Sequence, residues 1–175
     1  IELAANAGFL SPTTREVDIA VTLSAPSDSR LIAEPLTEYR LGLFASPDYL
    51  DRRGRPRRIA ELTGQMIVGY IDDLIYSQEL RYLDEVHHGL KPSIASTSIH
   101  AQRAIIENGG GIGVLPFFLA EGLEQIFPQR ICLTRRFWIS THRDVAETAR
   151  IKFVHTALRK VVSQKAARLM QPPSV

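Results

Sequence analysis

The alternation of apolar and polar residues is most regular between residues 93 and 119, where it predicts a strand, a helix and a second strand. Hydroxyl residues at 96–98 follow the first apolar run, and their side-chain oxygens can accept hydrogen bonds from the first N–H groups of a helix. Gly109 can end that helix, because glycine adopts the left-handed conformation without a Cβ clash. The apolar run 112–115, bounded by Pro116, predicts the second strand. We interpret this stretch as one parallel β-α-β unit.

The rest of the chain shows further strand and helix patterns. Strands are predicted at residues 1–6, 17–21, 31–36, 40–45, 65–69, 131–133 and 137–141. Helical segments are predicted at 9–16, 46–50, 59–62, 118–125 and about 147–170, with one more capped by Ser77 and ended by His87-His88-Gly89. The strand at 17–21 is largely apolar, which is typical of a parallel strand covered on both faces.

The glycine-rich segment 109–113 lies after a helix and before a strand. Phosphate-binding glycine loops have the opposite order, from strand to helix start, so this segment predicts a tight reversal and not a nucleotide cradle. The other end of the helix is the candidate ligand site, because hydroxyls and free N–H groups at a positive helix terminus attract an anion. Ordinary capping without a ligand is the alternative.

Composition narrows the class of protein without deciding it. The chain has 175 residues, 45% of them hydrophobic and 23% charged, as in ordinary globular domains. Its formal net charge of +2 gives no strong attraction to nucleic acid or to an anionic membrane. The single Cys132 excludes an internal disulfide and a cysteine-based metal site, and its apolar neighbours predict a buried, inert thiol. No apolar run is as long as the roughly 18 residues of a membrane span.

Residues with a recognisable chemistry are few. Arg53 to Pro56 read RGRP, the core of minor-groove AT-hooks, but their place between patterned segments favours a solvated loop. The catalytic and phosphate-binding signatures G-x-S-x-G, H-E-x-x-H, D-x-D-x-D-G and the Walker motif are absent from the sequence. Asp72 and Asp73 have no third ligand at a metal-binding spacing, and His142 is isolated. We therefore predict neither an enzyme nor a resident cofactor or metal.

Several segments stand in a characteristic order along the chain. They are E-V-D-I-A-V at 16–21, E-P-L at 34–36, L-G-L-F-A-S-P at 41–47, the stretch from the hydroxyls at 96–98 to G-V-L-P at 113–116, and F-W-I with H-R-D at 137–144. Together they resemble the effector-binding domain of LysR-type transcriptional regulators over nearly the whole chain.

The resemblance implies an α/β fold with two Rossmann-like lobes joined by two crossover strands, as in type 2 periplasmic binding proteins. Lobe I would comprise residues 1–50 plus 143–175, and lobe II residues 51–142. The family's first strand and helix of lobe I, and its N-terminal winged helix-turn-helix, have no counterpart here, and the chain opens at Ile1. We therefore expect a partial chain that continues upstream in the native protein.

The resemblance also implies a small-molecule effector site in the cleft between the lobes. Carried over by position, the effector-binding residues are Thr22, Leu23, Ser46, Tyr70, Ile71, Thr97, Ser98, Pro116 and Phe117. Polar caps beside Tyr and Phe suit a small organic acid, including an aromatic one.

The predicted function is effector sensing by a cytoplasmic DNA-binding regulator. By analogy the domain forms a homodimer or homotetramer through faces around Ile1–Glu16 and His100–Asn108. DNA contact would belong to the N-terminal module, and no membrane is involved. Two alternatives remain at this point: a periplasmic solute-binding protein of a transporter, which shares the two-lobed architecture, and a two-lobed enzyme.

Overall fold

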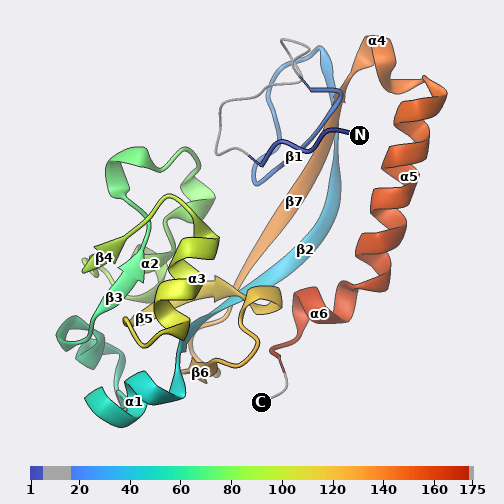
Figure 1. The fold of residues 1–175 in the computed structure, drawn as a ribbon. Coiled ribbons are helices and arrows are strands. Elements are labelled where there is room, and N and C mark those ends of the chain that lie inside the picture. Colours follow the sequence, from blue (N-terminus) through green and yellow to red (C-terminus); the bar gives the residue numbers. More distant parts are fainter. Residues whose placement is uncertain (6–16, 174–175) are drawn as a thin grey trace. The chain divides into compact units, whose positions relative to one another are not determined.

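The computed structural model describes residues 1–5 and 17–173 (Figure 1). The chain divides into two compact units. Unit 1 comprises Ile1–Glu38 and Arg136–Ala167, and unit 2 comprises Tyr39–Arg135 and Arg168–Val175. Strands β2 (Leu31–Ala45) and β7 (Leu133–His142) contribute residues to both units. The lobe boundaries predicted at residues 50 and 142 stay a prediction.

Unit 1 is built on the strand order β1-β7-β2. Strand β1 (Ile19–Thr22) runs antiparallel to β7, with Ile19 opposite Thr141 and Thr22 opposite Trp138. Helices α4 (Arg143–Ala146) and α5 (Ala149–Gln164) follow β7. An ion pair between Arg159 of α5 and Glu34 of β2 ties the long helix to the sheet of this unit.

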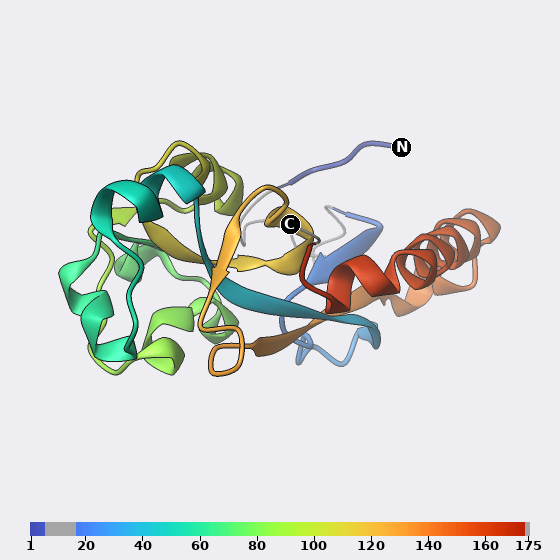
Figure 2. The ribbon, with the colours of Figure 1, turned by 90° about the horizontal axis from the view of Figure 1, so that it is seen from below.

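Unit 2 carries a mixed sheet in the order β2-β5-β3-β4, with β6 also paired to β2 (Figures 1 and 2). Strand β3 (Ile67–Gly69) runs parallel to both β4 (Ile94–Ala95) and β5 (Ile112–Pro116). Strand β2 is antiparallel to β5 and to β6 (Glu124–Ile126). The α-helices are α1 (Pro47–Arg53), α2 (Tyr82–Val86) and α3 (Ile99–Glu107), and α6 (Ala166–Met170) begins in unit 1 and ends in unit 2. Short 3-10 helices lie at Ile59–Gly64, Asp72–Leu74, Gln78–Leu80 and Phe117–Leu119.

The core of unit 2 forms where α3 covers β3 and β5. Ile106 of α3 packs with Val68, Leu115 and Phe117 in one buried cluster. Glycines allow this close approach: a Cβ on Gly113 would lie only 2.8 Å from the carbonyl oxygen of Val68. The helix can therefore sit directly on the sheet, which fixes the position of its N-terminus.

The strand-helix-strand prediction for residues 93–119 is confirmed. Ser98 caps α3, its Oγ accepting a hydrogen bond from the backbone N–H of Ala101. Gly109 follows the helix with a φ of 74°, in the left-handed region. Strands β4 and β5 are parallel, with β3 between them. The glycine-rich segment is the predicted reversal from helix to strand.

Several predictions for unit 1 are wrong or lie outside the described residues. The segment predicted as a covered parallel strand at 17–21 is the antiparallel strand β1, in which Val21 is 48% exposed. Residues 1–5 form no strand. The predicted helix at 9–16 and residue 6 lie outside the described part of the chain. The long C-terminal helix is divided at Lys165, whose N–H donates to the carbonyls of Val161 and Val162.

Other predictions differ from the structure in where strands and helices begin and end. The segments at 31–36 and 40–45 form one strand, β2. Strand β7 includes the segment predicted at 137–141, but of the segment predicted at 131–133 it takes in only Leu133. The helix predicted at 118–125 is a single 3-10 turn followed by β6. The helix expected after Ser77 is split at Arg81 into a 3-10 turn and α2. Cys132 is exposed and not buried, because the chain there has not yet entered β7.

Candidate ligand-binding site

Most of the predicted site residues lie at one edge of the sheet in unit 2. Because β3, β4 and β5 are parallel, their carboxyl ends meet at the same edge. Tyr70 and Ile71 follow β3, the hydroxyl residues 96–98 follow β4, and Pro116 and Phe117 stand at the end of β5. The carboxyl edge of an open α/β sheet is where ligands commonly bind.

The N-terminus of α3 is held in place at this edge. The Oγ of Ser96 accepts a hydrogen bond from the N–H of Ser98 at 3.2 Å, and the N–H of Ser96 donates to Gly69 of β3 at 3.0 Å. Gln102, which is 1% exposed, donates from Nε2 to the carbonyl oxygen of Ser96 at 2.9 Å. The loop is thus anchored to both the sheet and the helix.

That anchored helix end has unused hydrogen-bonding groups. Within residues 1–5 and 17–173, the N–H groups of Ile99 and His100 and the hydroxyl of Thr97 have no hydrogen-bond partner. Thr97 and Ser98 are exposed. Free N–H groups at a positive helix terminus are suited to a carboxylate or another anion.

Aromatic surface at the edge comes from Tyr70. Its ring meets that of Tyr82 edge-to-face, with 5.9 Å between centroids. Burial raises the pKa of the Tyr70 phenol, so the hydroxyl stays protonated and can donate a hydrogen bond at neutral pH. Phe117 is only 3% exposed and packs on Phe44. Pro116 is also buried. Pro116 and Phe117 therefore pack inside the sheet edge and offer little surface to a ligand.

Ser46 is not brought to this edge. It follows β2, which is antiparallel to β5 and pairs Ala45 with Ile112 at the opposite, amino end of β5. Ser46 is 4% exposed, and its Oγ accepts from the N–H of Tyr49 to cap α1. The structure therefore gives Ser46 a capping role within unit 2.

Thr22 and Leu23 belong to unit 1, at the end of β1. The Thr22 hydroxyl donates to the carbonyl oxygen of Ser24 at 2.8 Å. Their part in effector binding stays a prediction.

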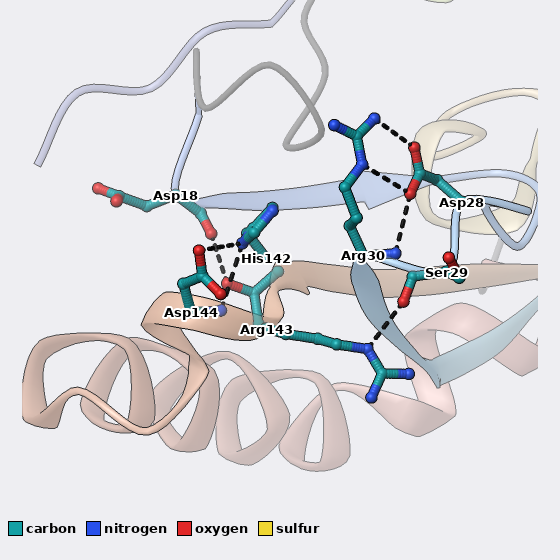
Figure 3. Close-up of polar contacts among 8 residues, drawn as sticks. Asp18, Asp28, Ser29, Arg30, His142, Arg143 and Asp144 are labelled. Carbon is teal, nitrogen blue, oxygen red and sulfur yellow. Dashed lines mark hydrogen bonds and ion pairs between the residues drawn. The ribbon is translucent and has the colours of Figure 1, made fainter.

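Unit 1 contains a polar cluster that the sequence did not reveal (Figure 3). The cluster connects the end of β7, Asp18 just before β1 and the loop before β2. The Nδ1 of His142, which is 9% exposed, accepts a hydrogen bond from the N–H of Asp144 at 3.2 Å. The Arg143 side chain donates to the carbonyl oxygen of Ser29, and the backbone N–H of Arg143 donates to the carbonyl oxygen of Arg30.

The same cluster contains a short-range ion pair. The Arg30 guanidinium donates to both carboxylate oxygens of Asp28 and lowers the pKa of that carboxyl to about 2. Because the cluster consists of hydrogen bonds and ion pairs between neighbouring residues and of a helix cap, we assign it a structural role.

In the described part of the chain, no group of three or more His, Cys, Asp or Glu residues could hold a metal ion. Across the same residues, no helix combines the length and apolarity needed to cross a membrane.

Comparison with known proteins identifies the family. The family model of the LysR substrate binding domain matches residues 12–163. The chain belongs to this family. The LysR substrate-binding domain described here is 27% identical to the HTH-type transcriptional regulator CrgA of Neisseria meningitidis serogroup C (strain 8013). The aligned region has 122 residues and covers 69% of this chain. The match covers 41% of CrgA, so the chain spans well under half of the length of that relative.

Solved structures show the same fold. The regulatory domain of CrgA from Neisseria meningitidis superposes with a TM-score of 0.78 at 24% identity, over 89% of this chain and 80% of that one. The regulatory domain of the C227S variant of AphB from Vibrio vulnificus gives 0.64 at 17% identity, over 87% and 80%. The predicted family and fold class are confirmed, and the comparisons do not support the periplasmic transporter alternative.

Proposed function

We propose that this LysR substrate-binding domain senses a small organic acid for a DNA-binding transcriptional regulator. The observation that carries the proposal is the N-terminus of α3, where the N–H groups of Ile99 and His100 have no acceptor among the described residues beside the exposed Thr97 hydroxyl. A carboxylate placed there gains several charge-assisted hydrogen bonds and the favourable end of the helix dipole.

The surroundings of the helix end favour one class of effector. Arg103, the cation within α3, is occupied by the carbonyl oxygen of Leu119 and by Glu107, so recognition relies on N–H and hydroxyl groups. Tyr70 adds a half-buried ring and a neutral hydroxyl on the neighbouring strand end. This set fits a compact acid with one carboxylate and a flat or aromatic body.

The effector would act by stabilising one arrangement of the regulator over another. A ligand shifts such an equilibrium only by its difference in affinity for the two states. The curated relatives are HTH-type transcriptional regulators, which supports DNA binding by an N-terminal module. Cytoplasmic action and assembly as a homodimer or homotetramer belong to the same proposal. The domain itself would neither bind operator DNA nor turn over its ligand, and either activity in the isolated chain would contradict the proposal.

The first test is a thermal-shift screen with small carboxylates and aromatic acids, followed by calorimetric titration of each hit. A ligand at about a hundred times its Kd adds about 2.7 kcal/mol of stability, which raises the Tm of a protein of this size by several degrees. Such a shift names the effector class.

The variant Thr97→Val separates binding from folding, because that hydroxyl makes no hydrogen bond to any described residue. Loss of one hydrogen bond to a charged ligand group costs about 1.5–3 kcal/mol, so affinity should fall by at least about tenfold with an unchanged Tm. Thr156→Val, at an exposed threonine of α5 in unit 1, is the matched control. A carboxylate that binds the parent and Thr97→Val equally well would place the site elsewhere.

A further inference from the structure

Unit 2 contains a cavity of about 170 Å³ that shares Tyr70 with the candidate effector site but is lined by no residue of the α3 N-terminus. Its walls all come from residues 70–91, the segment that leads from β3 to β4. Because this one segment belongs entirely to unit 2, the cavity is complete within that unit.

The inner wall of the cavity is apolar and firmly held. Leu80, Tyr82 and Leu90 are each at most 6% exposed. Arg135 lies over the Tyr82 ring, 5.5 Å from its centroid, and is fixed by a hydrogen bond to the carbonyl oxygen of Glu79 and by an ion pair with Glu85. A ligand would therefore meet a preformed wall, which lowers the entropic cost of binding.

The outer residues of the cavity carry charges of both signs. Asp72 and Asp84 contribute carboxylates, and Arg81 and Lys91 contribute cations. Within residues 1–5 and 17–173, none of these four side chains forms an ion pair or a hydrogen bond. The arginines at 55, 103 and 135 in the same unit are all paired with glutamates. Two unpaired carboxylates and two unpaired cations around an apolar wall form a rim with no net charge, complementary to a ligand with one charge of each sign.

We propose that this cavity binds a free α-amino acid with a small apolar side chain. The ammonium group would lie at the aspartates, the carboxylate at Arg81 and Lys91, and the side chain against the leucines and Tyr82. An enclosed apolar cavity of about 150 Å³ holds benzene, so this one has room for a ligand of roughly six to nine non-hydrogen atoms. Valine and leucine fall within that range. The assignment does not depend on the effector proposed for the α3 terminus.

The test is a titration of the ¹⁵N-labelled chain with L-valine and L-leucine, followed through the amide resonances of Leu83, Gly89 and Leu90. Saturable shifts in these amides are expected. N-acetyl-L-valine lacks the ammonium charge and L-valinamide lacks the carboxylate, so each should bind at least about tenfold more weakly. Absence of saturable shifts with both amino acids, or an analogue that binds as tightly as L-valine, would overturn the proposal.

Two charge-removing variants assign the ligand to the cavity. Asp72→Asn and Lys91→Gln should each weaken binding by at least about fivefold. Asp73→Asn is the matched control, because it makes the same change in the same 3-10 turn at a residue that does not line the cavity. Thr97→Val should leave amino-acid binding unchanged, which distinguishes this cavity from the effector site. Equal losses in Asp72→Asn and Asp73→Asn would refute the assignment.

Discussion

Gly113 stands where β5 approaches both β3 and α3, and we predict that alanine at this position destabilises the domain. A Cβ there would lie 2.8 Å from the carbonyl oxygen of Val68 and 2.7 Å from Cδ1 of Ile106. Val68 and Ile106 are both 0% exposed, so neither can move aside into solvent. The carbonyl belongs to a strand paired with β5, and shifting it would disturb the sheet. Overpacking of this kind costs about 1–3 kcal/mol.

Thermal unfolding followed by circular dichroism measures the effect. At this size, about 2 kcal/mol corresponds to a fall in Tm of roughly 4–8 °C. Gly64→Ala is the control, because a Cβ at Gly64 would meet nothing within 4 Å. That variant should be as stable as the parent, or more stable by up to about 1 kcal/mol. If Gly113→Ala unfolds at the same temperature as Gly64→Ala, the contact between β3 and β5 is not rigid and the reasoning is wrong.

Three further predictions concern single groups. Ser46→Ala removes the cap of α1 and should cost about 0.5–2 kcal/mol without changing effector affinity, as unfolding and titration together would show. In an NMR titration the Asp28 carboxyl should titrate near pH 2, below its usual 3.8, and Arg30→Gln should raise that midpoint. The stability contributed by this pair is therefore present above about pH 4 and is lost as the pH falls through 2. Burial raises the pKa of Tyr39 to about 12. The stability that the protonated Tyr39 side chain contributes to the folded state is therefore present below pH 10 and is lost as the pH rises through 12. Phenolate absorbance that develops near pH 10 in the fully folded parent and is missing from the Tyr39→Phe variant would contradict the last prediction.

The parts of the fold that the sequence predicts well are those fixed by neighbours along the chain. The strand-helix-strand segment at 93–119 contains its own helix cap at Ser98 and its own left-handed glycine at 109. Residues close together in the sequence therefore determine its boundaries. The long strands are different. Polar residues near 38 look like a break in β2, yet Glu38 pairs with Arg136 of β7. Such a cross-strand ion pair depends on a partner 98 residues away, which no local pattern shows.

The same distinction applies to the candidate site. Tyr70, Thr97 and Ser98 are predicted from the family resemblance, and in the structure each follows a strand of a parallel set, so they lie at one carboxyl edge. Ser46 also follows a strand, but that strand is antiparallel to its neighbour, so its end lies at the other edge. Strand direction is set by long-range pairing, and it decides which polar residues meet.

The distribution of aromatic residues gives each unit a spectroscopic reporter of its own. The only tryptophan of the sequence, Trp138, lies in unit 1, whereas all five tyrosines lie between residues 39 and 82 of unit 2. Trp138 is half-buried beside Arg136, whose guanidinium carbon lies 5.8 Å from its ring centroid. Fluorescence excited at the red edge, where only indole absorbs, therefore follows unit 1, while phenol absorbance follows unit 2. Unfolding or ligand binding confined to one unit can thus be seen in the unlabelled protein.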